Sequence, residues 1–278
     1  MALKIPYGKV LLIGILVLVL VVLLVVAICL PRASDPGGTA PSQTSAATTG
    51  EPTLPPPEAN PYGPTDFQYA GRYLTCLAGE SVLGIDVSAH QQTVDWQAVA
   101  QAGIRFVMIR VGYRGYESGA LEEDPYAQAN YLGAKQAGLQ VGAYFFSQAT
   151  SEHEAREEAA FLLHAIEGWE LDMPVVYDWE YISDEARTGG LDARTVTDCT
   201  RAFCQAVEAA GYAPMIYFNR HQAMEFLYLE ELVDYPFWLA LYSDRMTYPY
   251  KVEMWQYTET GRVPGVEGNV DINLWLPG

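Results

Sequence analysis

Basic residues are scarce in this chain of 278 residues. Sixteen lysines and arginines stand against 34 acids, which gives a formal net charge of -18. Binding to nucleic acid needs a basic footprint on the protein surface, so this balance argues against nucleic acid as a partner. An acidic surface is compatible with a soluble domain outside the cytoplasm.

Cysteine and histidine are also rare, with four of each. Cys199 and Cys204 are five residues apart on a predicted helix and therefore face different directions. A metal site would need closer spacing and more ligands. We expect these two, with Cys76, to be buried apolar groups that form neither disulfides nor a metal site. No metal and no organic cofactor is predicted.

The chain has a single long hydrophobic run, at residues 10–30. Its length is that of a helix that spans a bilayer. Lys4 and Lys9 precede it with no acid nearby, which places residues 1–9 in the cytoplasm and the remaining chain outside. The alternative is a cleaved signal peptide, but the run is long and Ala33-Ser34 is a poor cleavage site. We therefore expect a single-pass anchor in the cell membrane with an extracytoplasmic domain.

Residues 31–64 contain almost no large apolar side chains and are rich in Pro, Ser, Thr, Ala and Gly. Such a segment buries too little surface to offset its ordering entropy, so it is expected to be a disordered linker. A lead-in segment at 65–81 follows, and residues 82–278 are long enough for one barrel-sized domain, which we expect to be monomeric.

Short apolar runs alternate with amphipathic stretches in this last region. The expected strands are Val82–Ser88, Phe106–Tyr113, Val141–Phe146, Met173–Tyr177, Ala213–Asn219, Phe237–Ser243, Val252–Thr258 and Val270–Leu276. The expected helices cover about 95–100, 124–137, 151–168 and 195–210. Strands separated by helices predict a parallel sheet, and eight of them suggest closure into a barrel. Only a short loop fits between Ser243 and Val252, so the sequence predicts an irregular (β/α) barrel with fewer than eight helices.

Two carboxylates stand at the end of one apolar strand, in Asp178-Trp179-Glu180. Residues i and i+2 of a strand point to the same face, so both acids project together. In a β/α barrel the carboxyl end of a strand belongs to the catalytic face. Paired carboxylates are what cleavage of a glycosidic bond needs, one to donate a proton and one to meet the developing positive charge.

Other strand ends carry residues of the same kind: Asp86, Arg110, Tyr144, Tyr217, Asn219, Tyr242, Trp255 and Asp271. An apolar core does not explain acids on three separate strands, because a buried unpaired carboxylate is costly. Convergence on one pocket explains them together. Aromatic rings around the acids would offer flat faces for sugar rings, although each tyrosine is equally well explained as barrel core.

The sequence resembles glycoside hydrolase family 25, the Chalaropsis-type lysozymes. The matching stretches are GIDVSAHQ (84–91), FVMIRVGYRGY (106–116), VGAYFFSQA (141–149), PVVYDWE (174–180), MIYFN (215–219), WQYT (255–258) and VDINLW (270–275). Seven such stretches in order and in register across residues 82–278 are a specific signal. The resemblance implies an irregular β/α barrel with N-acetylmuramidase activity on peptidoglycan.

The resemblance also implies roles for the acids. Glu180 matches the proton donor, Asp178 the acid that steadies the charge or the 2-acetamido group, and Asp86 and Asp271 the two further acids of the pocket. Crowding raises the pKa of the least solvated acid and keeps it protonated near neutral pH.

Six further residues are candidates for substrate binding: Tyr144, Tyr217, Tyr242, Trp255, Arg110 and Asn219. Arg110 is equally well explained as part of a structural ion pair below the pocket. His90 is expected to give hydrogen-bonded support rather than chemistry.

Three functions are compatible with these features. The leading one is a membrane-tethered muramidase that hydrolyses the β-1,4 bond between N-acetylmuramic acid and N-acetylglucosamine in wall remodelling or turnover. The second is a catalytically silent barrel that binds wall glycans, and loss of one acid would be its sign. A chitinase-like enzyme should show a D-x-x-D-x-D-x-E run, but Val175 and Val176 occupy the middle of this strand.

Overall fold

The computed structural model describes residues 54–277. Eight strands form a closed barrel: β3 (Val82–Val87), β4 (Phe106–Arg114), β6 (Gln140–Ser147), β7 (Val175–Trp179), β8 (Pro214–Asn219), β9 (Phe237–Ala240), β10 (Met254–Gly261) and β11 (Val270–Trp275). The order around the barrel is β3-β11-β10-β9-β8-β7-β6-β4, and pairing of β3 with β4 closes it. A short strand, β5 (Leu121–Glu123), pairs with β4 outside this circle. The expected irregular eight-stranded barrel is confirmed.

One barrel strand runs against the others. β11 pairs antiparallel with both β10 and β3, whereas the remaining neighbours pair in parallel. The expectation of an entirely parallel sheet is wrong at this strand. Residues 262–269 between β10 and β11 are too few for the crossover that a parallel pair needs. The amino end of β11 therefore lies beside the carboxyl ends of the other strands.

The described residues contain five α-helices, α2 (Trp96–Gln101), α3 (Ala127–Gln136), α4 (Glu152–Ala165), α5 (Ala193–Ala209) and α6 (Arg220–Glu225), and two 3₁₀ turns, η1 (Ala89–Gln91) and η2 (Leu229–Glu231). The first four lie where the sequence predicts helices. Their side-chain caps explain several starts, since Asp95, Ser151 and Asp192 each accept a hydrogen bond from a backbone N–H in the first turn. The short helix α6 was not predicted.

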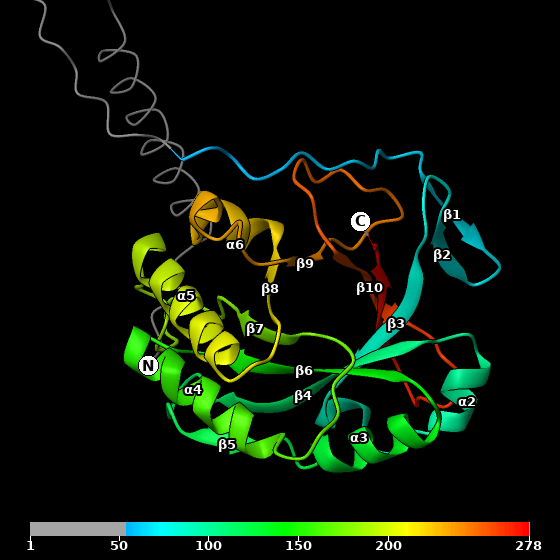
Figure 1. Cartoon of the computed structure of the whole chain (residues 1–278), viewed down its shortest axis with the longest axis horizontal. Coiled ribbons are helices and arrows are strands. Elements are labelled where there is room, and N and C mark those ends of the chain that lie inside the picture. The colour runs from blue at the N-terminus through cyan, green and yellow to red at the C-terminus, as the bar shows by residue number, and fades with distance from the viewer. Residues whose placement is uncertain (1–53, 278) are drawn as a thin grey trace, which may run out of the picture. The chain divides into compact units, whose positions relative to one another are not determined.

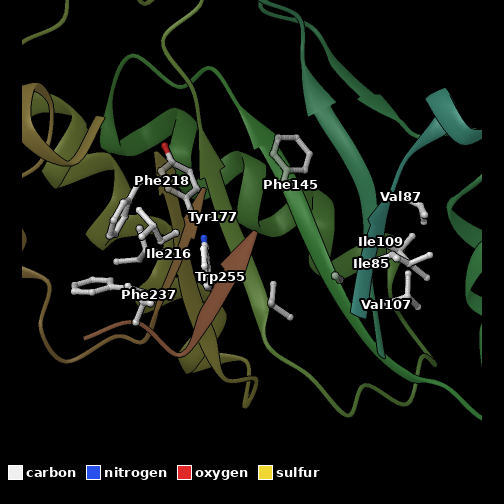
Figure 2. Close-up of a cluster of buried hydrophobic side chains, with 14 of the residues drawn as sticks. Ile85, Val87, Val107, Ile109, Phe145, Tyr177, Ile216, Phe218, Phe237 and Trp255 are labelled. Carbon is white, nitrogen blue, oxygen red and sulfur yellow. The ribbon is translucent and has the colours of Figure 1, made fainter. Parts of the chain in front are cut away.

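Alternation along the strands divides the apolar residues into two sets. One set fills the barrel interior and includes Phe106, Met108 and Trp238. The other set points outward and packs under the helices, and Figure 2 shows ten of its labelled members. Glycine is needed at Gly84 inside the barrel, because a Cβ atom there would lie 2.3 Å from the ring of Phe106.

The lead-in segment covers a part of the barrel that has no helix. It forms a hairpin of β1 (Phe67–Ala70) and β2 (Tyr73–Cys76), which lies on the side away from α4 and α5 (Figure 1). The ring of Phe67 packs edge-on against Trp255 of β10, with 4.9 Å between the ring centroids. The backbone N–H of Leu74 donates to the Tyr257 hydroxyl at 3.3 Å. The hairpin thus shields the outer face of β10 as a helix does elsewhere.

The last part of the expected linker is also ordered against the barrel. Ala59 forms an antiparallel bridge with Tyr250, and the Asn60 N–H donates to the Pro249 carbonyl at 2.9 Å. The chain therefore joins the domain before residue 64, because the loop that precedes β10 offers it backbone partners.

Residues 54–277 include no helix that is long and apolar enough to cross a membrane. The predicted span at 10–30 lies outside the described residues, as do residues 1–9 and most of the predicted linker.

Candidate active site

A pocket of about 330 Å³ opens at the carboxyl ends of the parallel strands. All four predicted catalytic acids line it. The complete lining is Asp86, Ser88, His90, Gln91, Arg110, Tyr144, Phe146, Asp178, Glu180, Tyr217, Trp238, Tyr242, Gln256, Glu259 and Asp271. The convergence expected from the separate strand ends is therefore present in the structure.

Asp178 lies in β7, and Glu180 is the residue directly after this strand. Both side chains line the same pocket. Burial raises the pKa of Glu180 to about 7, with the charge of Asp86 acting in the same direction. Burial, followed by the charges of Glu180 and Asp86, raises the pKa of Asp178 well above its usual value, and Arg110 opposes this shift. The pair therefore retains a proton near neutral pH. The Asp178 Oδ1 atom is buried and has no hydrogen-bond partner among the described residues.

Asp86 and Asp271 lie opposite each other on β3 and β11. Their approach depends on the reversed direction of β11, which places its second residue beside the end of β3. Burial raises the pKa of Asp86 to about 6. Burial and the charges of Asp86 and Glu259 raise the pKa of Asp271 to about 8. Four acids in one pocket thus hold their protons to higher pH than exposed acids do.

Side-chain amides hold Asp86 in a buried network. Its Oδ2 accepts hydrogen bonds from Gln256 Nε2 at 2.9 Å and from Asn273 Nδ2 at 2.8 Å. The Trp238 indole N–H donates to Asn273 Oδ1 at 2.9 Å. The predicted residues Tyr217 and Tyr242 both donate to Gln256 Oε1, at 3.1 and 3.2 Å. The two tyrosines therefore line the pocket and also orient the amide that binds Asp86.

Arg110 forms the structural ion pair that the sequence offered as one explanation of this residue, and it also lines the pocket. Its Nε donates to the buried Asp124 Oδ2 at 2.9 Å, and Asp124 also accepts from the backbone N–H of Ala89. Arg110 lines the pocket as well, where its charge opposes the rise in the pKa of Asp178. The ion pair fixes the guanidinium, so its charge acts on Asp178 from a fixed position.

Two predicted substrate-binding residues do not reach the pocket. Trp255 is fully buried on the outer face of β10, where its indole N–H donates to the Leu241 carbonyl at 2.8 Å. Its neighbour Gln256 points inward, and adjacent strand residues face opposite sides. Asn219 caps α6 and accepts the Gln222 backbone N–H at 3.0 Å. We therefore assign neither residue to sugar contact.

Tyr144 lies in the pocket as predicted, and His90 also lines it. The sequence reasoning missed Gln256, Asn273 and Glu259. Alternation was the available signal for the first two, since Gln256 follows the outward Trp255, and Asn273 shares the face of Asp271. Glu259 follows an irregularity in the pairing of β10 with β11, so simple alternation does not locate it.

The predicted burial of Cys76, Cys199 and Cys204 is confirmed, and all three are free thiols. Burial raises the pKa of the Cys199 thiol to about 12. Within residues 54–277, no group of three or more His, Cys, Asp or Glu side chains is arranged to hold a metal ion.

Four acids thus gather on the face of the barrel formed by the carboxyl ends of the parallel strands, and three of them come from those strand ends. The chain belongs to glycosyl hydrolase family 25, whose family model matches residues 85–266. It is 29% identical over 209 residues to the uncharacterized protein YegX of Escherichia coli (strain K12), covering 71% of each chain. It is 28% identical over 202 residues to lysozyme M1 of Streptomyces globisporus, covering 69% of this chain and 67% of the lysozyme.

Solved structures show the same fold. The bacterial lysozyme of Streptomyces coelicolor superposes with a TM-score of 0.57 at 28% identity, covering 71% of this chain and 92% of that chain. The modular autolysin LytC of Streptococcus pneumoniae, solved with a synthetic peptidoglycan ligand, gives a TM-score of 0.62 at 25% identity. That match covers 70% of this chain and 46% of LytC, so the chain spans less than half of the length of LytC.

Proposed function

We propose that this protein is a muramidase that hydrolyses the β-1,4 bond between N-acetylmuramic acid and N-acetylglucosamine in peptidoglycan. The observation that carries the proposal is that the buried Asp178 and the partly buried Glu180 face one pocket, where the pKa of Glu180 is raised to about 7. A carboxyl of this kind is still protonated near neutral pH and is able to protonate a leaving oxygen. The names of lysozyme relatives and the peptidoglycan bound to LytC support the same substrate.

The residues divide the chemistry between them. Glu180 donates its proton to the glycosidic oxygen, so that the bond to the muramic acid C1 breaks and the positive charge develops there. Asp178 faces the same pocket, and its unpartnered Oδ1 is suited to accept the N–H of the 2-acetamido group. Water then adds to C1 and returns a proton to Glu180. The charge of Asp86 raises the pKa of Asp178, of Glu180 and of Asp271.

The test is product analysis. Purified peptidoglycan is digested with the protein, reduced with borohydride and examined by mass spectrometry. Reduced muramic acid at the new ends identifies a muramidase, whereas reduced glucosamine ends would contradict the proposal. Glu180→Gln protein serves as the inactive control. Binding to wall glycan without any new reducing ends would instead favour the silent glycan-binding barrel.

We further propose that the protein is anchored by residues 10–30, with its barrel outside the cell. Lys4, Lys9 and the uninterrupted apolar run support this topology. Protease added to intact, wall-stripped cells should release an active domain of about 200 residues and leave a membrane stub. A complete domain in the culture medium, with a new amino terminus near Ala33, would show a cleaved signal instead.

A further inference from the structure

The backbone at Glu180 lies just beyond the hydrogen-bonded sheet. β6 pairs with β7 as far as Ser147 and Trp179, and β7 pairs with β8 as far as Asp178 and Tyr217. Glu180 follows the last residue of β7. Its flanking peptide groups therefore need partners other than the regular ladder.

A glutamine from the β6 side supplies the first partner. Gln148, directly after β6, is fully buried, and its Nε2 donates to the Glu180 carbonyl at 2.7 Å. The same amide nitrogen donates to the Ser147 carbonyl at 2.9 Å. Its Oε1 accepts the Thr188 hydroxyl at 2.9 Å, which fixes the orientation of the amide.

A second glutamine acts from the β8 side. Gln222 of α6 is buried, and its Nε2 donates to the Trp179 carbonyl at 2.9 Å. Its Oε1 accepts the Asn219 backbone N–H at 2.7 Å as half of a capping box. The start of α6 therefore holds this side chain in place.

The two carbonyls belong to the peptide groups on either side of the Glu180 Cα atom. Fixing both groups fixes the φ and ψ angles of Glu180 and hence the direction of its Cα–Cβ bond. We propose that Gln148 and Gln222 are positioning residues that together aim the Glu180 carboxyl into the pocket. This inference rests on the proposed function of Glu180 as the proton donor. Neither glutamine lines the pocket, so both act through the backbone.

Two substitutions remove the donors with little change in volume. Gln148→Met is similar in length but leaves the Glu180 carbonyl without its partner. Gln222→Glu keeps an acceptor for the Asn219 N–H, as a capping box allows, but loses the N–H that reaches Trp179. The control is Thr200→Val, which removes a buried hydroxyl that donates to the Val196 carbonyl within α5, away from the pocket.

We expect each glutamine variant of the full-length protein to lose about 10² in kcat on soluble glycan fragments, with little change in KM, because small misplacements of a catalytic group are costly. Thr200→Val should keep kcat within about twofold of the wild type, even if its unfolding midpoint falls as much as those of the glutamine variants. Gln148→Glu should recover activity at low pH, where a protonated carboxyl again donates to the Glu180 carbonyl. Wild-type kcat and pH profiles in folded Gln148→Met and Gln222→Glu would overturn the inference.

A second measurement does not depend on activity. The signal of the Glu180 carboxyl carbon is followed by ¹³C NMR as the pH is changed. It is assigned as the signal that is absent from the spectrum of Glu180→Gln. Gln148→Met, which adds no charge, should lower the pKa of Glu180 from about 7 toward its usual value, because a misaimed carboxyl is better solvated. An unchanged titration would overturn the inference. An inactive wild-type protein with this shift would refute the proposed function and leave the positioning role intact.

Discussion

Burial raises the pKa of the Glu180 carboxyl to about 7, so near neutral pH it exists in both charge states. A proton donor with this pKa gives up its proton readily while still holding it in a large fraction of the molecules. Burial and the charge of Glu180 raise the pKa of Asp178 well above its usual value. Both acids of the pair therefore hold a proton to higher pH than exposed carboxyl groups do.

Glu180→Gln is expected to lower the rate of hydrolysis by about 10² to 10⁴, because the amide cannot donate the proton that general acid catalysis needs. The fold should remain intact, since the side chains are nearly isosteric. Rates on purified peptidoglycan and circular dichroism measure the two effects. Glu167→Gln, at an exposed position outside the barrel, is the matched control. Full activity in folded Glu180→Gln would remove Glu180 from this role.

Asp86→Asn should move the alkaline limb of the pH profile to lower pH. The negative charge of Asp86 raises the pKa of Glu180, so removing that charge lowers this pKa and Glu180 loses its proton earlier as the pH rises. The profile of kcat/KM against pH tests the shift. A reduced rate with an unchanged alkaline limb would limit Asp86 to binding or structure.

The acids could be predicted from the sequence because a carboxylate at a strand end is a rare and costly choice. Alternation could also have placed Gln256 and Asn273 on the pocket face. Gln148 and Gln222 could not be predicted, because they are ordinary polar residues until their partners are known. Trp255 was misassigned because its residue type suggested sugar stacking. Its position beside Gln256 places it on the outer face of the same strand.

At the scale of elements, the apolar runs in the sequence were enough to locate the strands. The direction of each strand depended instead on the length of the link that precedes it. The eight-residue link before β11 left only the antiparallel arrangement, which brings Asp271 beside Asp86. The β1–β2 hairpin had no comparable signal. Its role depends on contacts with β10 that are distant in sequence.

Phe67→Ala should destabilise the domain by about 3–5 kcal/mol, because it leaves a cavity against Trp255. Tyr69→Ala is the control on the same strand, since Tyr69 is 54% exposed and should cost less than about 0.5 kcal/mol. Urea unfolding followed by tryptophan fluorescence compares the two. Equal stabilities would show that the hairpin does not support the barrel.

For the whole molecule, the pocket acids predict stability that falls with rising pH. Asp86, Glu180 and Asp271 have folded-state pKa values of about 6, 7 and 8, above the values near 4 that they have in the unfolded chain. Between about pH 4 and 8 the folded state therefore binds more protons than the unfolded chain does. The contribution of these acids to the free energy of unfolding is lost progressively as the pH rises across that range. Scanning calorimetry should show a falling Tm, with a shallower slope in Asp271→Asn.

The opposite dependence is expected at lower pH. Hydrogen bonds from Arg187 lower the pKa of Glu154 to about 2, so this contribution is lost as the pH falls below about 4. The Tm should therefore be highest near pH 4 to 5. A Tm that rises steadily from pH 5 to 8 would contradict the raised pKa values of the pocket acids.

The ordered lead-in also determines how the barrel responds to mechanical load. A pull on the chain at residue 54 meets the bridge between Ala59 and Tyr250 first, and then the β1–β2 hairpin. Only after both have peeled away does the force reach β3, which is held by neighbours on both sides and carries Asp86. We therefore expect tension on the amino-terminal side to break the bridge and the hairpin, which can form again, before it strains the strand that carries Asp86.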